Sequence, residues 1–368
     1  MTDVELTIDD VKVIGKEGMM ILDAAELAGV NIPTLCHIRG LHPIGGCRIC
    51  VVEVEGSSRL VGSCHTPIAE GMVVKTRSPK VLQTRKTLVE LMLAGHTGPC
   101  VSDTRIGQCE LNSIASGLEV GPPRFQARRA RTYPVENVSP YLTRDMTKCI
   151  LCGRCVIACA EIAKKDVFGT GYRGFSSKIV VDCDVVIDKE VCKNCGICAE
   201  YCPTSALTIP GVAVQKKAVR AEAVTGRSAA EQSRHDRLLS MLEKAQGEFG
   251  YVPEKFIAET AASLAMTISD VYGVASFYSF LSLQPRGRNI IRVCGNVPCQ
   301  MKGAHTVVES LRKELGIAPG ETTPDGRFSL ELTNCIGACD EAPAVLVNDD
   351  IHGGLTPEKL SRVLKDYA

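Results

Sequence analysis

Hydrophobic and polar residues alternate along the first part of the chain, as they do in strands with one buried face. Residues 4–8 and 11–14 alternate on either side of Asp9-Asp10, which predicts a β-hairpin because successive strand side chains point to opposite faces. Residues 21–30 then carry apolar side chains at helical spacing. Further strands are predicted at 51–54, 60–61 and 72–75. A hairpin, a helix, a loop and more strands together predict a β-grasp domain.

The next part of the chain first carries apolar residues at helical spacing and then contains several prolines. Apolar residues recur at helical intervals over 81–94, so we expect a helix that delivers His96 and Cys100 at its C-terminal end. The prolines between 119 and 140 predict an extended connector. Residues 215–233 are rich in Ala, Lys, Arg, Glu and Ser and predict an interdomain linker.

The last part of the chain changes from a helical to a mixed pattern. Apolar residues over 238–245 predict an amphipathic helix that stops near Gly247 and Gly250, and further helices are predicted from Pro253 and near Thr267. A small β-α-β-β-α unit follows, with strands expected at 290–293, 328–332 and 344–347 and helices at 307–315 and 360–364. A helical bundle joined to this unit is the predicted arrangement.

Composition narrows the class of protein. The 368 residues include 42 basic and 42 acidic side chains, so a dominant electrostatic attraction to nucleic acid or to an anionic membrane is not expected. No basic and apolar leader and no run of about 18 apolar residues is visible, so neither a signal peptide nor a membrane span is predicted. The 19 cysteines have metal-site spacings that require reduced thiols. We therefore expect a cytoplasmic protein.

The strongest pattern is a pair of cysteine runs. Each has the C-x2-C-x2-C-x3-C spacing of a ferredoxin with two 4Fe-4S clusters, in which the fourth cysteine of each run ligates the other cluster. The spacing predicts two ligand sets, namely Cys149, Cys152, Cys155 and Cys202, and Cys192, Cys195, Cys198 and Cys159. Cys183 falls outside the runs and is expected to be a small buried side chain.

Two further sets of four cysteines have the spacing of 2Fe-2S sites. The first set, with gaps of 10, 2 and 13 residues, is Cys36, Cys47, Cys50 and Cys64. Four cysteines also suit zinc, but a β-grasp setting favours iron, and Gly45 and Gly46 let the loop approach a cluster. The second set follows two predicted strands and consists of Cys294, Cys299, Cys335 and Cys339. A redox-active dithiol is the alternative there, although it normally uses C-x2-C.

These motifs resemble a known group of proteins. The gaps in the first set, and the text SPYLTRDMTKCILCGRCV, GYRGFSS and CPTSAL around the two runs, resemble the N-terminal part of the large Fe-S subunit of respiratory complex I. The same part opens many iron hydrogenases and NAD-linked formate dehydrogenases. Residues 235–368, with the segment GVASFYSF, resemble the thioredoxin-like 2Fe-2S subunit of complex I and of NAD-dependent multimeric hydrogenases. In that segment Phe277 and Tyr278 are expected to lie in the bundle core.

One site departs from the family pattern. The resemblance implies a further 4Fe-4S cluster bound by one histidine and three cysteines, and the matching positions here are His96, Cys100, Asp103 and Cys109. Asp103 replaces a cysteine, and a carboxylate is a harder ligand for iron than a thiolate. Asp103 as a ligand, water or nothing in its place, and loss of the cluster are the three outcomes left open.

The expected fold is an α+β multidomain chain. Its parts are a plant-type 2Fe-2S ferredoxin domain, a His/Cys/Asp 4Fe-4S segment, a two-cluster 4Fe-4S ferredoxin domain, a linker, and a helical bundle with a thioredoxin-like 2Fe-2S domain. The corresponding ranges are 1–79, 80–120, 121–212, 213–234 and 235–368.

No dinucleotide, P-loop or flavin motif is recognisable, so we expect no catalytic centre on this chain. The resemblance implies a flavoprotein partner that binds FMN and NAD(P), and a catalytic subunit of hydrogenase or formate dehydrogenase type. The chain is then predicted to be an electron-transfer subunit of a complex, some relatives of which bifurcate electrons with ferredoxin. A free-standing multicluster carrier and a scaffold with structural clusters are the alternatives. The substrate, the choice of NAD or NADP, bifurcation and stoichiometry stay open.

A basic run in the connector has two interpretations. Arg124, Arg128, Arg129 and Arg131 suit a solvated or ion-paired segment, or a docking surface for an acidic partner such as ferredoxin.

Overall fold

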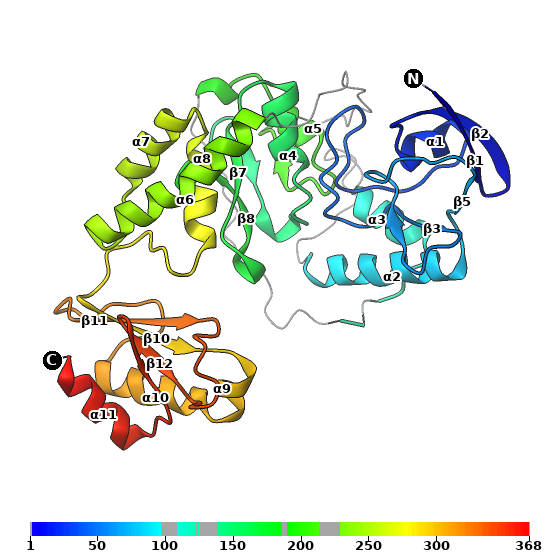
Figure 1. Cartoon of the computed structure of the whole chain (residues 1–368). Helices are drawn as coiled ribbons and strands as arrows, with labels where there is room; N and C mark the ends of the chain where they lie inside the picture. Colours follow the sequence, from blue (N-terminus) through cyan, green and yellow to red (C-terminus); the bar gives the residue numbers. More distant parts are fainter. Residues whose placement is uncertain are drawn as a thin grey trace. The chain divides into compact units, whose positions relative to one another are not determined.

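The structure is a computed structural model that describes residues 2–96, 109–122, 124–125, 139–185, 190–212 and 229–367 (Figure 1). It divides into two compact units. The first contains Met1–Gln232 together with Met266–Gly273, and the second contains Ser233–Ala265 together with Val274–Ala368. None of the described helices is both long and apolar enough to cross a membrane.

The first unit begins with a five-stranded sheet, drawn in blue in Figure 1. Its strands are β1 (Asp3–Ile8), β2 (Val11–Lys16), β3 (Val51–Val54), β4 (Val61–Gly62) and β5 (Met72–Lys75). Their order is β2-β1-β5-β3-β4, and β1 pairs parallel to β5 while the other pairs are antiparallel. Helix α1 (Ile21–Leu27) packs Ile21 and Ala25 against Leu6 and Val74. The predicted hairpin, helix and strands are confirmed, although the helix ends before residue 30.

Two helices cover the loop that follows the sheet. Helix α2 (Pro79–Ala94) begins where the Ser78 hydroxyl accepts a hydrogen bond from the Val81 N–H, and Pro79 occupies its first turn. The sequence did not predict α3 (Glu110–Gly117), which buries Leu111 against α2. Together the two helices bury one face of the cysteine-rich loop after α1.

The ferredoxin part is built from short elements that repeat. They are β6 (Thr143–Arg144), η1 (Met146–Lys148), α4 (Arg154–Ile157), η2 (Ala158–Ile162), β7 (Phe168–Gly171), η3 (Gly174–Ser176), β8 (Lys178–Val181), η4 (Glu190–Cys192), α5 (Ile197–Glu200) and β9 (Leu207–Thr208). The strands form two antiparallel pairs, β6 with β9 and β7 with β8. Helices α4 and α5 each follow a left-handed glycine, Gly153 at φ 74° and Gly196 at φ 69°.

The start of helix α8 (Ile268–Phe277), up to Gly273, also belongs to the first unit. The Ser269 hydroxyl donates to the Val167 carbonyl and accepts from the Asp182 N–H. A side chain on Gly169 would meet the Ser269 backbone and Cβ at 2.7–2.9 Å. Close contact between α8 and the β7–β8 pair therefore requires glycine at this position.

The second unit combines helices with a four-stranded sheet. Its elements are α6 (Ala229–Phe249) from Ser233 onward, α7 (Glu254–Leu264), β10 (Asn289–Cys294), α9 (Val297–Met301), α10 (Ala304–Leu315), β11 (Phe328–Thr333), β12 (Val345–Val347), β13 (Asp350–His352) and α11 (Pro357–Asp366). The order is β11-β10-β12-β13, and only β10 and β11 run parallel. Helices α10 and α11 bury Leu311 and Leu360 against the sheet.

Several details differ from the sequence predictions. Helix α6 already begins at Ala229, inside the range 213–234 that we expected as a linker, and it continues through Gly247. Phe277 and Tyr278 were predicted to lie in the bundle core, and this is wrong, because they are 52% and 43% exposed. Their rings contact each other edge to face, with centroids 5.2 Å apart. One aromatic ring thus covers part of the other while both face outward.

Candidate metal centres

The first set of cysteines gathers at the loop between α1 and β3 and at the end of β4. Cys36, Cys47, Cys50 and Cys64 are between 1% and 6% exposed. Cys36 shares a hydrogen bond with Cys47, and Cys50 shares one with Cys64, so the four sulfurs form two pairs. The Cys47 N–H also donates to the Cys36 sulfur at 3.4 Å.

Within each pair, the hydrogen bond makes one thiol more acidic and the other less acidic. The hydrogen bond from Cys36 lowers the pKa of Cys47 to about 6, and the one from Cys64 lowers the pKa of Cys50 to about 6. The same bonds, reinforced by burial, raise the pKa of Cys36 and of Cys64. Two thiol pairs suit two neighbouring metal ions.

Cys202 of the second ferredoxin run joins three cysteines of the first run around one cavity. This cavity is partly open to solvent. Its four thiols are those of Cys149, Cys152, Cys155 and Cys202, and apolar side chains such as Met146 and Leu207 make up much of the rest. Burial, followed by the nearby Cys202 sulfur, raises the pKa of Cys152. Thiols in such a place become thiolates when a metal compensates the charge, which is the behaviour expected of cluster ligands.

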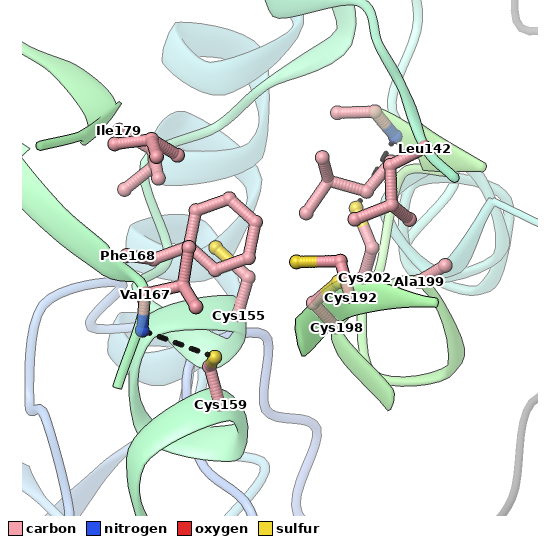
Figure 2. Packing of buried hydrophobic residues seen from close by; sticks show 13 residues of the cluster. Leu142, Cys155, Cys159, Val167, Phe168, Ile179, Cys192, Cys198, Ala199 and Cys202 are labelled. Atoms are coloured by element: carbon pink, nitrogen blue, oxygen red, sulfur yellow. Dashed lines mark hydrogen bonds between the residues drawn. The ribbon is translucent and has the colours of Figure 1, made fainter. Parts of the chain in front are cut away.

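The second half of the ferredoxin part mirrors the first. Burial raises the pKa of Cys198, and Cys159, Cys192 and Cys195 raise it further in that order. Figure 2 shows Cys192, Cys198 and Cys202 facing Cys155 and Cys159 across the core, with Phe168 beside them. The Val167 N–H donates to the Cys159 sulfur at 3.4 Å. Main-chain donors of this kind stabilise negative charge on sulfur.

The structure describes two of the four residues of the histidine site, His96 and Cys109. The Nδ1 atom of His96 lies 2.9 Å from the Lys148 carbonyl oxygen. A carbonyl only accepts, so the proton sits on Nδ1 and Nε2 keeps the lone pair that a metal ligand needs. Cys109 stands directly before α3. Cys100 and Asp103 lie outside the described residues.

The C-terminal set of cysteines lies where two parallel strands end together. Cys294 closes β10, and it is opposite Thr333, the last residue of β11. Cys294 and Cys299 are buried, whereas Cys335 and Cys339 are exposed with their sulfurs 3.5 Å apart. The pKa of Cys299 is raised by burial and then by its contact with Cys294 and the charge of Cys335, so all four thiols share one site. Cys183 was expected to be buried, but it lies half-buried in the turn after β8.

A shared core connects the N-terminal centres of the first unit. Cys36 and Cys47 belong to one buried cluster with Val89 and Leu111, and Cys109 and Cys152 pack against it. Arg154, which precedes the ligand candidate Cys155, donates to both Glu110 carboxylate oxygens at 2.9 and 3.0 Å and to the Thr34 carbonyl at 3.4 Å. One guanidinium thus links the ferredoxin part, helix α3 and the first cysteine loop.

Comparison with known families divides the chain in the same way. Residues 1–79 match a 2Fe-2S iron-sulfur cluster binding domain, 139–208 match the ferredoxin-like domain of NADH-quinone oxidoreductase subunit 3, and 224–368 match the thioredoxin-like [2Fe-2S] ferredoxin family.

Curated relatives match different parts of the chain. The NADP-reducing hydrogenase subunit HndD of Solidesulfovibrio fructosivorans is 37% identical over 213 residues, which are 56% of this chain and 36% of HndD. HndA, from the same hydrogenase, is 39% identical over 130 residues, 35% of this chain and 76% of HndA. An NADH-quinone oxidoreductase subunit of Rhizobium meliloti is 34% identical over 206 residues, 55% of this chain and 24% of that protein. The chain spans only about a quarter to a third of the length of these large relatives.

A solved structure, an NAD+-reducing [NiFe]-hydrogenase in the H2-reduced state, gives a TM-score of 0.51 at 29% identity, covering 57% of this chain and 88% of the matched one. The chain therefore belongs, through its C-terminal part, to the thioredoxin-like [2Fe-2S] ferredoxin family, and it joins this HndA-like module to the iron–sulfur region that it shares with HndD and with the Rhizobium meliloti protein.

Proposed function

We propose that the chain is a multi-cluster iron–sulfur electron-transfer subunit of an NAD(P)H-linked, flavin-dependent oxidoreductase complex, of hydrogenase or formate dehydrogenase type. The observation that carries this proposal is the buried core in which the Cys36–Cys47 thiol pair packs together with Cys152 of the ferredoxin cavity. Redox centres embedded in one continuous core are held at fixed separations, as relayed electron transfer requires. The many reduced thiols favour a cytoplasmic location.

The residues fit four clusters, with a fifth at the histidine site. Each thiol pair of a 2Fe-2S centre would hold one iron, so Cys36 with Cys47 and Cys50 with Cys64 are the N-terminal ligands. The C-terminal 2Fe-2S ligands are Cys294, Cys299, Cys335 and Cys339, and the two ferredoxin sets hold 4Fe-4S clusters. A third 4Fe-4S cluster would be held by His96, Cys100 and Cys109, with Asp103, water or nothing at the fourth position. When bound, such clusters take up and release single electrons.

An exposed apolar surface supports a permanent subunit rather than a free-standing carrier. Val297 and Met301 of helix α9, which contains Cys299, are 69% and 82% exposed, and Leu332 of β11 is 53% exposed. Val297 and Met301, four residues apart on the helix, form what we call the α9 patch, and the exposed thiols of Cys335 and Cys339 follow β11. Apolar surface beside a redox site marks a protein–protein contact. We assign the contact to a flavoprotein subunit that binds FMN and NAD(P).

The test is anaerobic purification of the tagged chain from its own cells, with mass spectrometry of the bound proteins. We expect an FMN- and NAD(P)-binding flavoprotein and a catalytic subunit, and the latter identifies the substrate. A ferredoxin in the same preparation would identify a second electron carrier. The chain recovered alone with all its iron would refute the subunit role and leave a free-standing carrier.

A matched pair of variants tests the contact itself. Met301→Lys places a charge in the α9 patch and should release the flavoprotein. Ile351→Lys places the same charge on β13, at the opposite edge of the same sheet, where Ile351 is 52% exposed. Retention of the flavoprotein by Met301→Lys, or its equal loss from both variants, would exclude the α9 patch as the contact.

A further inference from the structure

A histidine contacts the N-terminal thiol set from outside it. His65 follows Cys64, and its Nδ1 lies 3.5 Å from the Cys64 sulfur. Its other ring nitrogen, Nε2, lies 3.2 Å from Nη1 of Arg48, which stands in the loop between Cys47 and Cys50. The imidazole therefore bridges a ligand sulfur and the loop that carries two further ligands.

Arg48 determines which ring nitrogen carries the proton. A guanidinium only donates hydrogen bonds, so Nε2 must accept the bond from Arg48. In a neutral imidazole the proton then sits on Nδ1, which points at the Cys64 sulfur. Arg48 adopts φ +58°, a left-handed conformation that is costly for a residue other than glycine. Its side chain contacts the imidazole at Nε2, while Nδ1 faces the Cys64 sulfur.

One glycine leaves the space that the ring occupies, and a second glycine borders it. A Cβ atom on Gly62 would lie 2.2 Å from Cε1 and 2.8 Å from Nδ1 of His65. A Cβ atom on Gly45 would lie 3.5 Å from the same Nδ1. Gly62 has an ordinary φ, so alanine there would leave the backbone unstrained and would push the ring from the sulfur. The absence of a side chain at Gly62 thus allows the ring to lie beside the Cys64 sulfur.

We propose that His65 is a positioning residue that donates a hydrogen bond from Nδ1 to the Cys64 thiolate and raises the reduction potential of the N-terminal 2Fe-2S centre. This rests on the proposed function only in that the first thiol set must hold such a centre. A donor near sulfur stabilises the reduced form more strongly, since reduction adds negative charge to the ligands. The step is a one-electron reduction, by dithionite in the experiment, and the proton stays on Nδ1.

The test is a redox titration of the full chain under anaerobic conditions, followed by EPR. A Cys335→Ser background removes the C-terminal centre, so that the remaining 2Fe-2S signal reports on the N-terminal one. His65→Phe keeps the bulk of the ring and removes the donor. We expect the ratio of reduced to oxidised centre at fixed solution potential to fall about tenfold, which is about 59 mV for one electron. Gly62→Ala should give a similar fall with the histidine still present.

Two further variants separate this role from a structural one. His65→Asn places an amide N–H near the position of Nδ1 and should restore much of the potential. His37→Phe is the matched control, because His37 follows Cys36 and its buried Nδ1 has no hydrogen-bond partner among the described residues. We expect no shift from this variant.

The outcomes are distinct. An unchanged potential in both His65→Phe and Gly62→Ala, with the 2Fe-2S signal present, overturns the inference and leaves the proposed function intact. An equal shift in His37→Phe also overturns it. Absence of the N-terminal signal from the chain with His65 in place contradicts the proposed function itself.

Discussion

Arg154→Met removes the guanidinium that links the ferredoxin part to α3 and to the first cysteine loop while keeping an apolar side chain of similar length. The Arg154 side chain is 9% exposed and that of its partner Glu110 is 34% exposed. The change leaves Glu110 without the two short hydrogen bonds from Nη1, and the Thr34 carbonyl loses its bond as well. We therefore expect the contact between these three segments to open more often.

The size of the effect follows from burial. Breaking a buried ion pair by removing one partner costs about 3–5 kcal/mol. Glu110 is partly exposed, so water screens its unpaired charge, and we expect the change to cost about 2–3 kcal/mol here. Each 1.4 kcal/mol is about tenfold in an equilibrium constant, and the opening constant should rise about 30- to 150-fold.

Release of iron to a chelator under anaerobic native conditions measures this opening. When closing is faster than chelation, the release rate is proportional to the opening constant. Glu110→Gln should accelerate release as well, and the double variant should add little, because both changes remove the same interaction. Release at the original rate from Arg154→Met, or simple additivity in the double variant, would refute the reasoning.

Arg312→Met is the control. Arg312 pairs with Glu309 at 3.0 Å, but both side chains are at least half exposed, at 50% and 67%. Surface pairs contribute little, so this variant should release iron at nearly the original rate.

Three further predictions concern single sites. Cys335→Ser should remove about two irons and one of the two 2Fe-2S EPR signals, because it breaks one thiol pair, whereas Cys183→Ser should leave the iron content unchanged. His96→Ala should lower the iron content by about four atoms per chain if the histidine site is loaded, from about sixteen to about twelve. An unchanged iron content means that this cluster is absent. Gly169→Ala should lower the melting temperature followed by visible circular dichroism, because its Cβ would press on Ser269 at a cost of about 1–3 kcal/mol. Gly117→Ala has open space and should not.

Local patterns made much of the first sheet predictable. The alternation over 4–14 requires only neighbouring residues, and the strand register follows from it. Helix α3 was missed because it has only eight residues, including serines, an asparagine and a glycine, and its support comes from burial of Leu111 and from the ion pair with Arg154. Such support is not visible in a local stretch of sequence.

The candidate sites were likewise predictable where the signal is local in the sequence and not where it depends on the fold. Spacing alone grouped the cysteines, since clusters constrain their ligands to short loops. The role of His65 was missed, although a histidine beside Cys64 and after Gly62 was a visible signal. Its meaning depends on Arg48, 17 residues away, and only the fold brings them together. Phe277 and Tyr278 were misplaced because a helical apolar pattern does not indicate whether anything covers that face.

The exposure of Cys335 and Cys339 has a consequence for the order of assembly. The Gly337 N–H and the neighbouring Cys339 thiol lower the pKa of Cys335, and the two sulfurs are 3.5 Å apart. An exposed thiol with thiolate character beside a second thiol is the first to react with oxygen-derived oxidants, and here it would close a disulfide. The N-terminal thiols, enclosed in their core, are shielded from this reaction. A newly made chain in air therefore loses its C-terminal site first, and iron or a covering protein must reach that site early in maturation.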